Sequence, residues 1–268
     1  YESFQASAAT QNDWQLCGNA TMVPPFNAVL AYRAVQRINT LNVPGDIVEL
    51  GVWRGGVSCF MARSQLRFGV HSAPARHLWL FDTFEGMPEP SVKDGMRERW
   101  MWQRVHNGSM TKAAGGVRDG KWAFAPLDEV QQTLARTSYP PDRLHYIAGK
   151  VEHTLRDNAS LPSTIALLRL DTDFFESTRA ELDLLWPRLA PGGWLYVDDY
   201  SAYQGSRRAV DEWLAAGPGW TEAAKEAKAF KRTKYHPRGP TDDLIGSFQV
   251  WKAPEGSPLP FDVRNGSV

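Results

Sequence analysis

The sequence contains little cysteine. Its 268 residues include only Cys17 and Cys59, and Cys59 falls inside a predicted helix. Disulfide-rich proteins are typically small and secreted, and they carry several paired cysteines. We therefore expect no disulfide framework, and we expect the protein to work in a reducing, cytoplasmic location.

An excess of charge is also missing. Lys plus Arg and Asp plus Glu each number 30, so the formal net charge at pH 7 is zero. This balance lacks the electrostatic footprint of a protein that binds nucleic acid or an anionic membrane. No apolar run approaches the length of a membrane span either. We therefore expect no nucleic-acid or membrane partner, and a substrate that is not a polyanion.

The order of the predicted elements is typical of an α/β fold. Short apolar runs alternate with segments in which apolar residues recur at helical spacing. Strands are predicted at 46–50, 78–81, 143–148, 165–170, 194–197 and 247–251, and helices at 28–38, from about 58, at 127–134 and at 207–214. Residues 1–25 are expected to form an extended arm. Without an internal repeat or a visible boundary, we predict one domain over 1–268, with an N-terminal arm and helix over 1–40.

A strand, a helix and a second strand are predicted between residues 165 and 197. Thr178 and Glu181 have the spacing of a capping box, which predicts that the helix begins near Thr178. Leu182, Leu185 and Leu189 give this helix one apolar face. Such a crossover places the carboxyl ends of both strands at one edge of a parallel sheet, where open α/β sheets bind ligands.

Four aspartates follow these two strand ends. Asp171 and Asp173 come after the first strand, and Asp198 and Asp199 come after the second, so we expect all four to converge. Carboxylates in one cleft repel one another and raise one another's pKa unless a cation or a shared proton compensates them. Magnesium is favoured because it prefers carboxylate oxygens, and no His or Cys spacing suggests zinc. The alternative for any single aspartate is that it caps the following helix.

A glycine-bearing turn follows the first predicted strand. Gly51 to Gly56 lead into a helix near Ser58, and such a turn lets the backbone and the helix N-terminus approach a nucleotide. The spacing differs from G-x-G-x-x-G, and Glu49 would repel a pyrophosphate, so the turn favours a positively charged nucleoside over NAD. Asp82, after the second strand, is placed to accept from both ribose hydroxyls, although an aspartate there also suits a turn.

Residues 89–124 show no clean periodicity. They contain charges, glycines and three tryptophans, Trp100, Trp102 and Trp122. A loop of this length inside a compact domain is usually a lid or a disordered insert. The tryptophans favour a lid that closes over an apolar or sugar-like ligand, and the alternative is a helical insert that packs on the core.

Four motifs occur in order along the chain. They are Asp46-Ile-Val-Glu-Leu-Gly-Val-Trp-Arg-Gly-Gly, Phe81-Asp-Thr-Phe-Glu-Gly-Met-Pro, Leu170-Asp-Thr-Asp-Phe-Phe-Glu-Ser-Thr and Val197-Asp-Asp-Tyr. Over roughly residues 21–251 this set resembles the macrocin O-methyltransferase (TylF) family, and four ordered motifs are more specific than one. The resemblance implies a Rossmann-like class I methyltransferase: a mostly parallel sheet with helices on both faces, a terminal antiparallel strand, the N-terminal arm and a lid insertion over 89–124.

The resemblance also implies two cofactors, S-adenosylmethionine and Mg²⁺, and the residues that hold them. The metal ligands would be Asp171, Asp198 and Asp199, and Asp173 would be the general base. The cofactor would be bound by Thr21, Met22, Glu49, Gly51, Val52, Trp53, Gly55, Ser58, Asp82, Thr83, Phe84, Gly149, Lys150 and Asp171.

The acceptor side is less well defined. We expect Trp122 and Tyr200 to contact the acceptor. The sequence departs from the family's usual pattern at Thr172, where glycine is usual, and Phe174 and Phe175 enlarge the apolar wall beside the base. These differences leave open which sugar and which hydroxyl the protein would methylate.

The chemistry fits the residues. A sugar hydroxyl is a poor nucleophile at neutral pH, so methyl transfer needs a group that removes its proton, and a divalent ion assists by lowering the hydroxyl's pKa. Together with the resemblance, the residues predict a metal-dependent O-methyltransferase that acts on a sugar hydroxyl of a glycosylated antibiotic-type molecule, and we expect a homo-oligomer. A catechol or other phenolic acceptor is the main alternative. A nicotinamide-dependent oxidoreductase is disfavoured by the glycine spacing, and a non-catalytic nucleoside-binding module by the four carboxylates.

Overall fold

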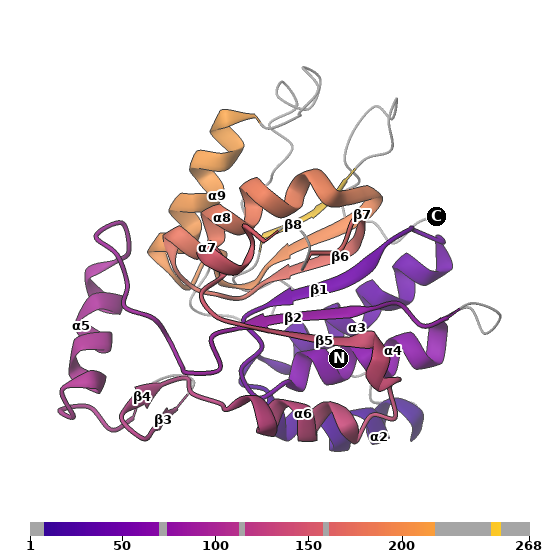
Figure 1. Ribbon diagram of the computed structural model, residues 1–268, viewed down its shortest axis with the longest axis horizontal. Helices are drawn as coiled ribbons and strands as arrows, with labels where there is room; N and C mark the ends of the chain where they lie inside the picture. The colour runs from indigo at the N-terminus through magenta and orange to yellow at the C-terminus, as the bar shows by residue number, and fades with distance from the viewer. Residues whose placement is uncertain (1–7, 70–73, 113–115, 158–160, 218–247, 253–268) are drawn as a thin grey trace, which may run out of the picture.

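The computed structural model describes residues 8–69, 74–112, 116–157, 161–217 and 248–252 (Figure 1). The strands are β1 Asp46–Leu50, β2 Leu78–Asp82, β3 Val117–Arg118, β4 Lys121–Trp122, β5 Leu144–Ala148, β6 Ile165–Leu170, β7 Leu189–Val197 and β8 Phe248–Trp251. The helices are α2 Ala8–Cys17, α3 Pro25–Thr40, α4 Gly56–Phe68, α5 Met96–His106, α6 Leu127–Ala135, α7 Val151–Thr154, α8 Phe175–Leu185 and α9 Gln204–Ala216. Short 3₁₀ turns are η1 Gly18–Ala20, η2 Pro141–Arg143, η4 Trp186–Arg188 and η5 Asp198–Tyr200.

A six-stranded sheet with the order β5-β2-β1-β6-β7-β8 forms the centre of the fold. The first five strands are parallel, and β8 pairs with β7 in the antiparallel direction. Helices α3, α4 and α6 cover one face, and α7, α8 and α9 cover the other (Figure 1). Because both faces are covered, the central strands are mostly apolar, and every residue of β6 is buried, including Arg169. The Rossmann-like architecture expected from the sequence is confirmed.

The register of the sheet fixes what meets at its carboxyl edge. Leu50 of β1 pairs with Leu170 of β6, and Leu170 pairs with Val197 of β7. The residues that follow these three positions therefore leave the sheet side by side, among them Asp171 and Asp198. The convergence expected from the strand-helix-strand pattern follows from this alignment.

The N-terminal arm differs from its expected form. Instead of an extended segment, the described part of the arm is helix α2 followed by the turn η1. A disulfide joins Cys17 of α2 to Cys59 of α4, with 5.6 Å between the Cα atoms, contrary to the expectation of unpaired cysteines. Asp13 adds ion pairs to Arg63 and Arg67 of α4, at 2.7 and 2.8 Å. The partners are far apart in sequence, so only the folded chain brings them together.

Helix α8 begins earlier than the capping-box spacing predicts. It starts at Phe175, so Thr178 and Glu181 lie inside the helix, and both are buried. The N-cap residue itself makes no side-chain cap bond. The amide of Phe175 instead donates to Asp94, which lies 81 positions earlier, and Glu181 accepts a hydrogen bond from Thr172. The prediction failed because a distant side chain supplies the cap.

The insertion over 89–124 contains helix α5 and the β3–β4 hairpin, and it projects beyond the sheet at the left of Figure 1. A cluster of apolar side chains joins it to the rest of the protein. The cluster centres on Val105, Trp122 and Phe174, and Met87, Trp102 and Tyr203 pack against it, with others. These contacts agree with the alternative expectation, a helical insert that packs on the core. Closure of the insertion over a ligand stays a prediction.

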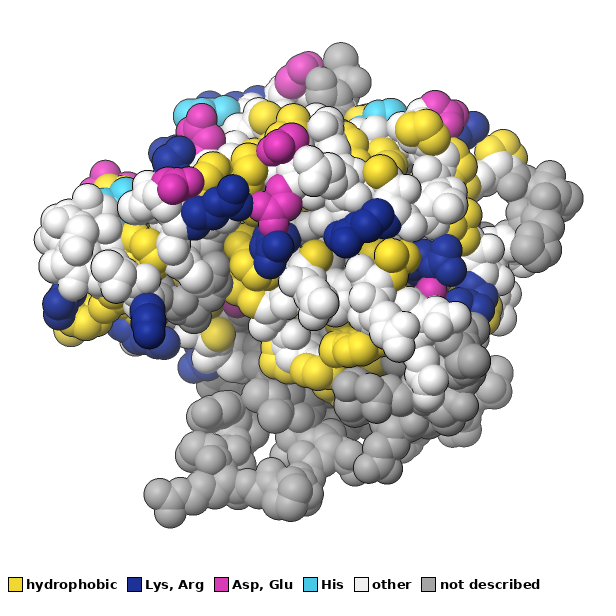
Figure 2. Space-filling view, turned by 90° about the horizontal axis from the view of Figure 1, so that it is seen from below, with side chains coloured by type: hydrophobic (Ala, Val, Ile, Leu, Met, Phe, Trp, Pro, Cys, Tyr) yellow, Lys and Arg dark blue, Asp and Glu magenta, His cyan; other side chains and the backbone are white. Residues whose placement is uncertain are grey.

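Within the described ranges, no helix combines the length and apolar character that crossing a membrane would require. The face in Figure 2 shows Lys and Arg side chains interspersed with Asp and Glu. This mixture agrees with the balanced composition of the chain.

Candidate functional site

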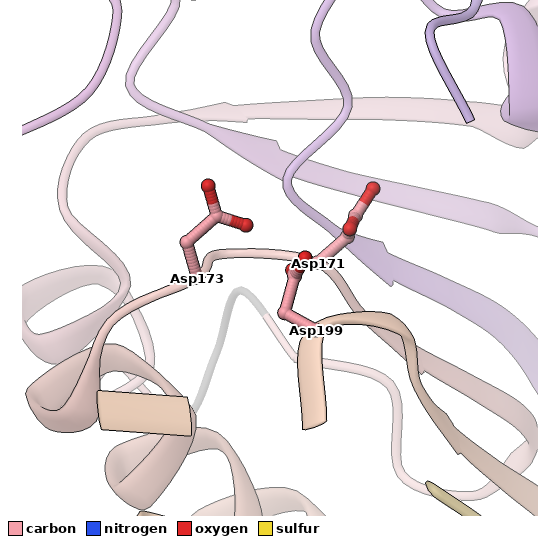
Figure 3. Close-up of side chains that lie close together, drawn as sticks. All are labelled: Asp171, Asp173 and Asp199. Atoms are coloured by element: carbon pink, nitrogen blue, oxygen red, sulfur yellow. The ribbon is translucent and has the colours of Figure 1, made fainter. Parts of the chain in front are cut away.

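Three carboxylates meet at the carboxyl edge of the sheet (Figure 3). Asp171 and Asp173 belong to the turn between β6 and α8, and Asp199 lies in η5, directly after β7. One carboxylate oxygen from each lies within 4.8 Å of the others. These distances allow one small cation to contact all three side chains.

Asp173 occupies an unusual backbone conformation. Its φ is +67°, a left-handed value that side-chain-bearing residues rarely adopt. The amide of Phe174 donates to the carbonyl of Thr172 at 2.8 Å, so residues 172–174 form a γ-turn with Asp173 at its centre. The turn reverses the chain immediately after β6 and directs the Asp173 carboxylate toward the space shared with Asp171 and Asp199. The sequence pattern predicts the position of Asp173 after the strand but not this turn.

The three carboxylates lie close together and are largely shielded from solvent. Burial raises the pKa of Asp171 and Asp199 well above the usual range of an aspartate, and the neighbouring carboxylates raise it further. Burial likewise raises the pKa of Asp173 to about 7. The raised pKa values favour protonation of the cluster when no cation is bound, and side-chain hydrogen bonds link Asp199 to Asp171 and to Asp173.

Asp198 lines the same cleft but directs its carboxylate to protein partners. Its Oδ1 accepts from Asn27 Nδ2 at 2.8 Å and from the Tyr196 hydroxyl at 2.5 Å, and its Oδ2 lies 3.1 Å from Arg169 Nη2. Asp198 is therefore outside the group of three, although sequence reasoning placed it with Asp171 and Asp199 as a ligand. A carboxylate oxygen has two lone pairs, so these contacts leave room for a further bond.

The turn after β1 lies beside the carboxylates and forms a second part of the cleft. Gly51 has a φ of +84°, and a Cβ there would lie 1.9 Å from the carbonyl oxygen of Asp171, so only glycine fits. Asp82 holds this turn: its Oδ2 accepts from the amides of Val52 and Trp53 at 2.7 and 3.0 Å. Its Oδ1 accepts from the amide of Phe84 at 2.8 Å. Asp82 therefore stabilises the turn and also lines the cleft.

The cleft brings together many of the residues that the sequence singled out. Those that line it are Met22, Gly51, Trp53, Asp82, Thr83, Trp122, Gly149, Lys150, Asp171, Asp173, Asp198 and Asp199. Those that do not are Thr21, Glu49, Val52, Gly55, Ser58, Phe84 and Tyr200. The second group includes supporting residues, because Val52 and Phe84 bind Asp82 through their amides, and the fully buried Glu49 accepts a hydrogen bond from Ser58.

The acceptor side of the cleft is aromatic. Trp122 and Tyr203 line it, and Phe174 packs edge-on against both, with ring centroids 6.4 and 6.3 Å away. Tyr200, expected beside the acceptor, instead packs into the core and donates its hydroxyl to Asp211 at 2.8 Å.

Sequence reasoning missed three site residues. Arg169 is the only charged residue in the apolar run of β6, and a charge in a buried strand requires partners, so a signal existed. Tyr203 donates a hydrogen bond to Asp173, and Asn27 donates one to Asp198. Neither lies in a recognisable motif, so only the fold identifies them.

The residues fit a divalent cation. The donor set consists of carboxylate oxygens, which Mg²⁺ prefers. Asp199 Oδ2 is a buried atom without a hydrogen-bond partner among the described residues. Such an atom is costly unless something binds it, and a cation held by Asp171 and Asp199 would do so.

The chain matches a known family through most of its length. Residues 3–218 fit the family model described as macrocin-O-methyltransferase (TylF). The chain belongs to the TylF family. The expectation from the four ordered motifs is thereby confirmed.

Two relatives illustrate the TylF match. The 8-demethyl-8-(2,3-dimethoxy-alpha-L-rhamnosyl)-tetracenomycin-C 4'-O-methyltransferase of Streptomyces olivaceus is 37% identical over 179 residues, which are 67% of this chain and 61% of the relative. The demethyldecarbamoylnovobiocin O-methyltransferase of Streptomyces niveus is 34% identical over 174 residues, which are 65% of this chain and 60% of the relative. The matched region thus spans about 60% of the length of these relatives.

Solved structures support the same fold. The O-methyltransferase NovP superposes with a TM-score of 0.65 at 26% identity, covering 87% of this chain and 82% of NovP. The calicheamicin methyltransferase CalS11 superposes with a TM-score of 0.54 at 19% identity, covering 93% and 95% of the two chains. The second likeness concerns the fold alone.

Proposed function

We propose that this TylF-family chain transfers a methyl group from S-adenosylmethionine to a sugar hydroxyl of a glycosylated natural product, with Mg²⁺ as a second cofactor. The observation that carries the proposal is that one cleft holds two groups. The carboxylates of Asp171, Asp173 and Asp199 line it together with the Gly51 turn that Asp82 holds. Neither group alone would identify the reaction.

The nucleoside would lie on the Gly51 side. Gly51, Trp53, Thr83 and Lys150 line this part of the cleft, and Met22 approaches it from the arm. S-adenosylmethionine would supply an electrophilic methyl group. The chain's task is to bind it in line with the acceptor oxygen, because alignment alone can contribute several kcal/mol to lowering a barrier.

The acceptor hydroxyl would lie on the carboxylate side. Asp171 and Asp199 would hold the cation, with Asp198 as a further ligand, and a cation there would lower the pKa of the hydroxyl and fix its position. Asp173 would accept the proton as general base.

A phenolic acceptor is a second candidate, and a specific observation favours it. The wall of Trp122, Phe174 and Tyr203 offers flat apolar surface beside the carboxylates. A catechol could chelate the same cation and stack on this wall. For a glycoside, the same wall would contact the aglycone.

The deciding experiment is a methyl-transfer screen with radiolabelled S-adenosylmethionine. The panel contains glycosylated natural products, their aglycones and simple catechols, each assayed with Mg²⁺ and with EDTA. Mg²⁺-dependent labelling of glycosides but not of the matched aglycones supports the proposal. Labelling of catechols alone selects the second candidate, and no labelling despite cofactor binding rejects methyl transfer to both classes.

A further inference from the structure

The γ-turn at Asp173 needs support from its surroundings. A residue that carries a side chain pays a conformational cost at a φ of +67°, so the turn persists only where neighbouring contacts hold it. Asp173 sits between two elements that could supply such contacts, the end of β6 and the start of α8. A buried carboxyl group contacts the chain on each side of the turn.

The first anchor is Asp94, from the loop that opens the insertion. This side chain is 5% exposed, and its Oδ1 accepts from the amide of Phe175 at 2.7 Å, the first residue of α8. Its Oδ2 accepts from the amide of Ser91 at 2.7 Å, which holds the carboxylate in place. A negative charge at the start of α8 is also favoured by the helix dipole.

Helix α9 packs tightly over the same junction. A Cβ on Gly205 would lie 1.8 Å from Asp94 Oδ1 and 2.8 Å from the Phe175 amide nitrogen, so only glycine leaves room for this hydrogen bond. On the exposed side, Lys93 Nζ lies 3.0 Å from Glu176 and 4.3 Å from the centre of the Phe175 ring. The loop that carries Lys93 and Asp94 therefore packs directly against the start of α8.

The second anchor is the pair formed by Thr172 and Glu181. The Thr172 hydroxyl donates to Glu181 Oε1 at 2.8 Å, and Glu181 is fully buried inside α8. The other oxygen, Oε2, has no hydrogen-bond partner among the described residues. Thr172 is thus a principal polar contact of a buried carboxyl group, and this contact ties the residue before Asp173 to α8.

We propose that Asp94 and Thr172 are positioning residues that hold the Asp173 turn in the orientation required for proton removal. Asp94 fixes Phe175, two positions after Asp173, and the hydrogen bond from Thr172 to Glu181 fixes the residue directly before Asp173. Because Asp94 belongs to the insertion, docking of the insertion and orientation of the base are parts of one arrangement. This inference rests on the proposed methyl transfer, in which Asp173 is the base.

The test compares Asp94→Ala and Asp94→Asn with the wild type under Mg²⁺-saturating conditions. Loss of the anchor should lower kcat by about 10²-fold in Asp94→Ala, the effect of a misplacement of about 1 Å. Asp94→Asn retains one acceptor oxygen and should fall between. The dissociation constant of S-adenosylmethionine should not change, because Asp94 is not one of the residues that line the cleft. Asp119→Asn is the matched control, because Asp119 belongs to the same insertion and its side chain is 75% exposed. The kcat of this variant should equal that of the wild type.

Thr172 gives an independent arm of the test. Thr172→Val keeps the shape of the side chain and removes the hydroxyl, so kcat should fall while cofactor affinity is kept, and Thr172→Ser should restore the rate. Wild-type kcat in Asp94→Ala and Thr172→Val would overturn the inference, as would an equal loss of kcat and cofactor affinity, which indicates general damage.

Hydrogen exchange separates this inference from the proposed function. The amide of Phe175 should exchange faster in Asp94→Ala than in the wild type, whether or not an acceptor is known. If the wild type methylates no acceptor but the Phe175 amide exchanges faster in Asp94→Ala, the proposed function is rejected. The inference that Asp94 holds the start of α8 is then still supported. Unchanged exchange would reject the anchor itself.

Discussion

Arg169 and Glu49 form an ion pair inside the sheet, with 2.7 Å between Nη1 and Oε1 and 1% of each side chain exposed. The Nη2 of the same guanidinium lies 2.8 Å from Asp171 and 3.1 Å from Asp198. One buried cation therefore links the end of β1 with the carboxylates of the candidate metal site. A buried charge is tolerated only when it is paired, so these four residues depend on one another.

Replacing Arg169 by Met should destabilise the protein strongly. The side chains of Glu49, Asp171 and Asp198 would lose the guanidinium group that pairs with them. Breaking such a buried pair costs about 3–5 kcal/mol in the free energy of unfolding. Urea denaturation of the metal-free protein measures this change. Arg208→Met is the control: Arg208 pairs with Glu212 at the surface, and such a pair contributes at most about 1 kcal/mol. Equal destabilisation by the two variants would contradict the assigned role of Arg169.

The disulfide should contribute to stability through the unfolded chain. Cys17 and Cys59 are 42 positions apart, and closing a loop of this length lowers the entropy of the unfolded state. Reduction, or the Cys17→Ser/Cys59→Ser variant, should lower the free energy of unfolding by about 2–4 kcal/mol. Urea denaturation with and without a reducing agent measures the effect, and the double variant should be insensitive to the agent. Two free thiols in the native protein, counted by alkylation and mass spectrometry, would contradict the pairing.

The convergence of the aspartates could be predicted because it follows from topology. Parallel strands end at one edge of a sheet, and the strand-helix-strand pattern makes β6 and β7 parallel neighbours. The strand ends that carry Asp171 and Asp198 therefore lie side by side, whatever conformation the loops adopt. The same reasoning explains why Gly51 and Asp82 were found to line the cleft.

Side-chain orientation could not be predicted in the same way. Asp198 turns to Asn27, Tyr196 and Arg169, and these partners come from three different elements. The start of α8 was misplaced because its cap is supplied by Asp94 from the insertion. Local patterns carry no information about such contacts, which form only when distant segments pack together.

Asp82 should affect cofactor affinity by two routes. Asp82→Ala removes a group in the cleft and also frees the amides of Val52 and Trp53, so S-adenosylmethionine binding should weaken by about 1–3 kcal/mol. Asp82→Asn keeps one acceptor oxygen for these amides and should lose less. Titration calorimetry measures both variants, with Mg²⁺ affinity as the internal control. An unchanged dissociation constant in Asp82→Ala would limit Asp82 to a turn role.

Asp171 and Asp173 should fail in different ways. If Asp171 is a ligand, Asp171→Asn should lose Mg²⁺ affinity and regain part of its activity at high Mg²⁺. If Asp173 is the base, Asp173→Asn should bind Mg²⁺ and cofactor but lose about 10²–10⁴-fold in turnover, the usual contribution of a general base. Steady-state kinetics and calorimetry on each variant measure the difference. Loss of metal binding in Asp173→Asn would move Asp173 to the ligand set.

Metal binding should release protons, and its affinity should depend on pH. In the metal-free protein, burial raises the pKa of Asp173 to about 7 from a usual value of 3.8, and the pKa of Asp171 and Asp199 is raised as well. Between these two values the folded chain binds more protons than the unfolded chain, so the metal-free fold should become less stable as pH rises from about 4 to about 7.

A cation needs the ionised carboxylates, so the apparent Mg²⁺ affinity should rise over the same range while the proton is displaced. Calorimetric titrations at pH 6 in two buffers of different ionisation enthalpy measure the release, because the observed heat then depends on the buffer. Asp173→Asn lacks one of the titrating groups and should release fewer protons than the wild type. A binding heat that is the same in both buffers, together with an affinity that is flat from pH 5 to 8, would show that the carboxylates are already ionised without the metal.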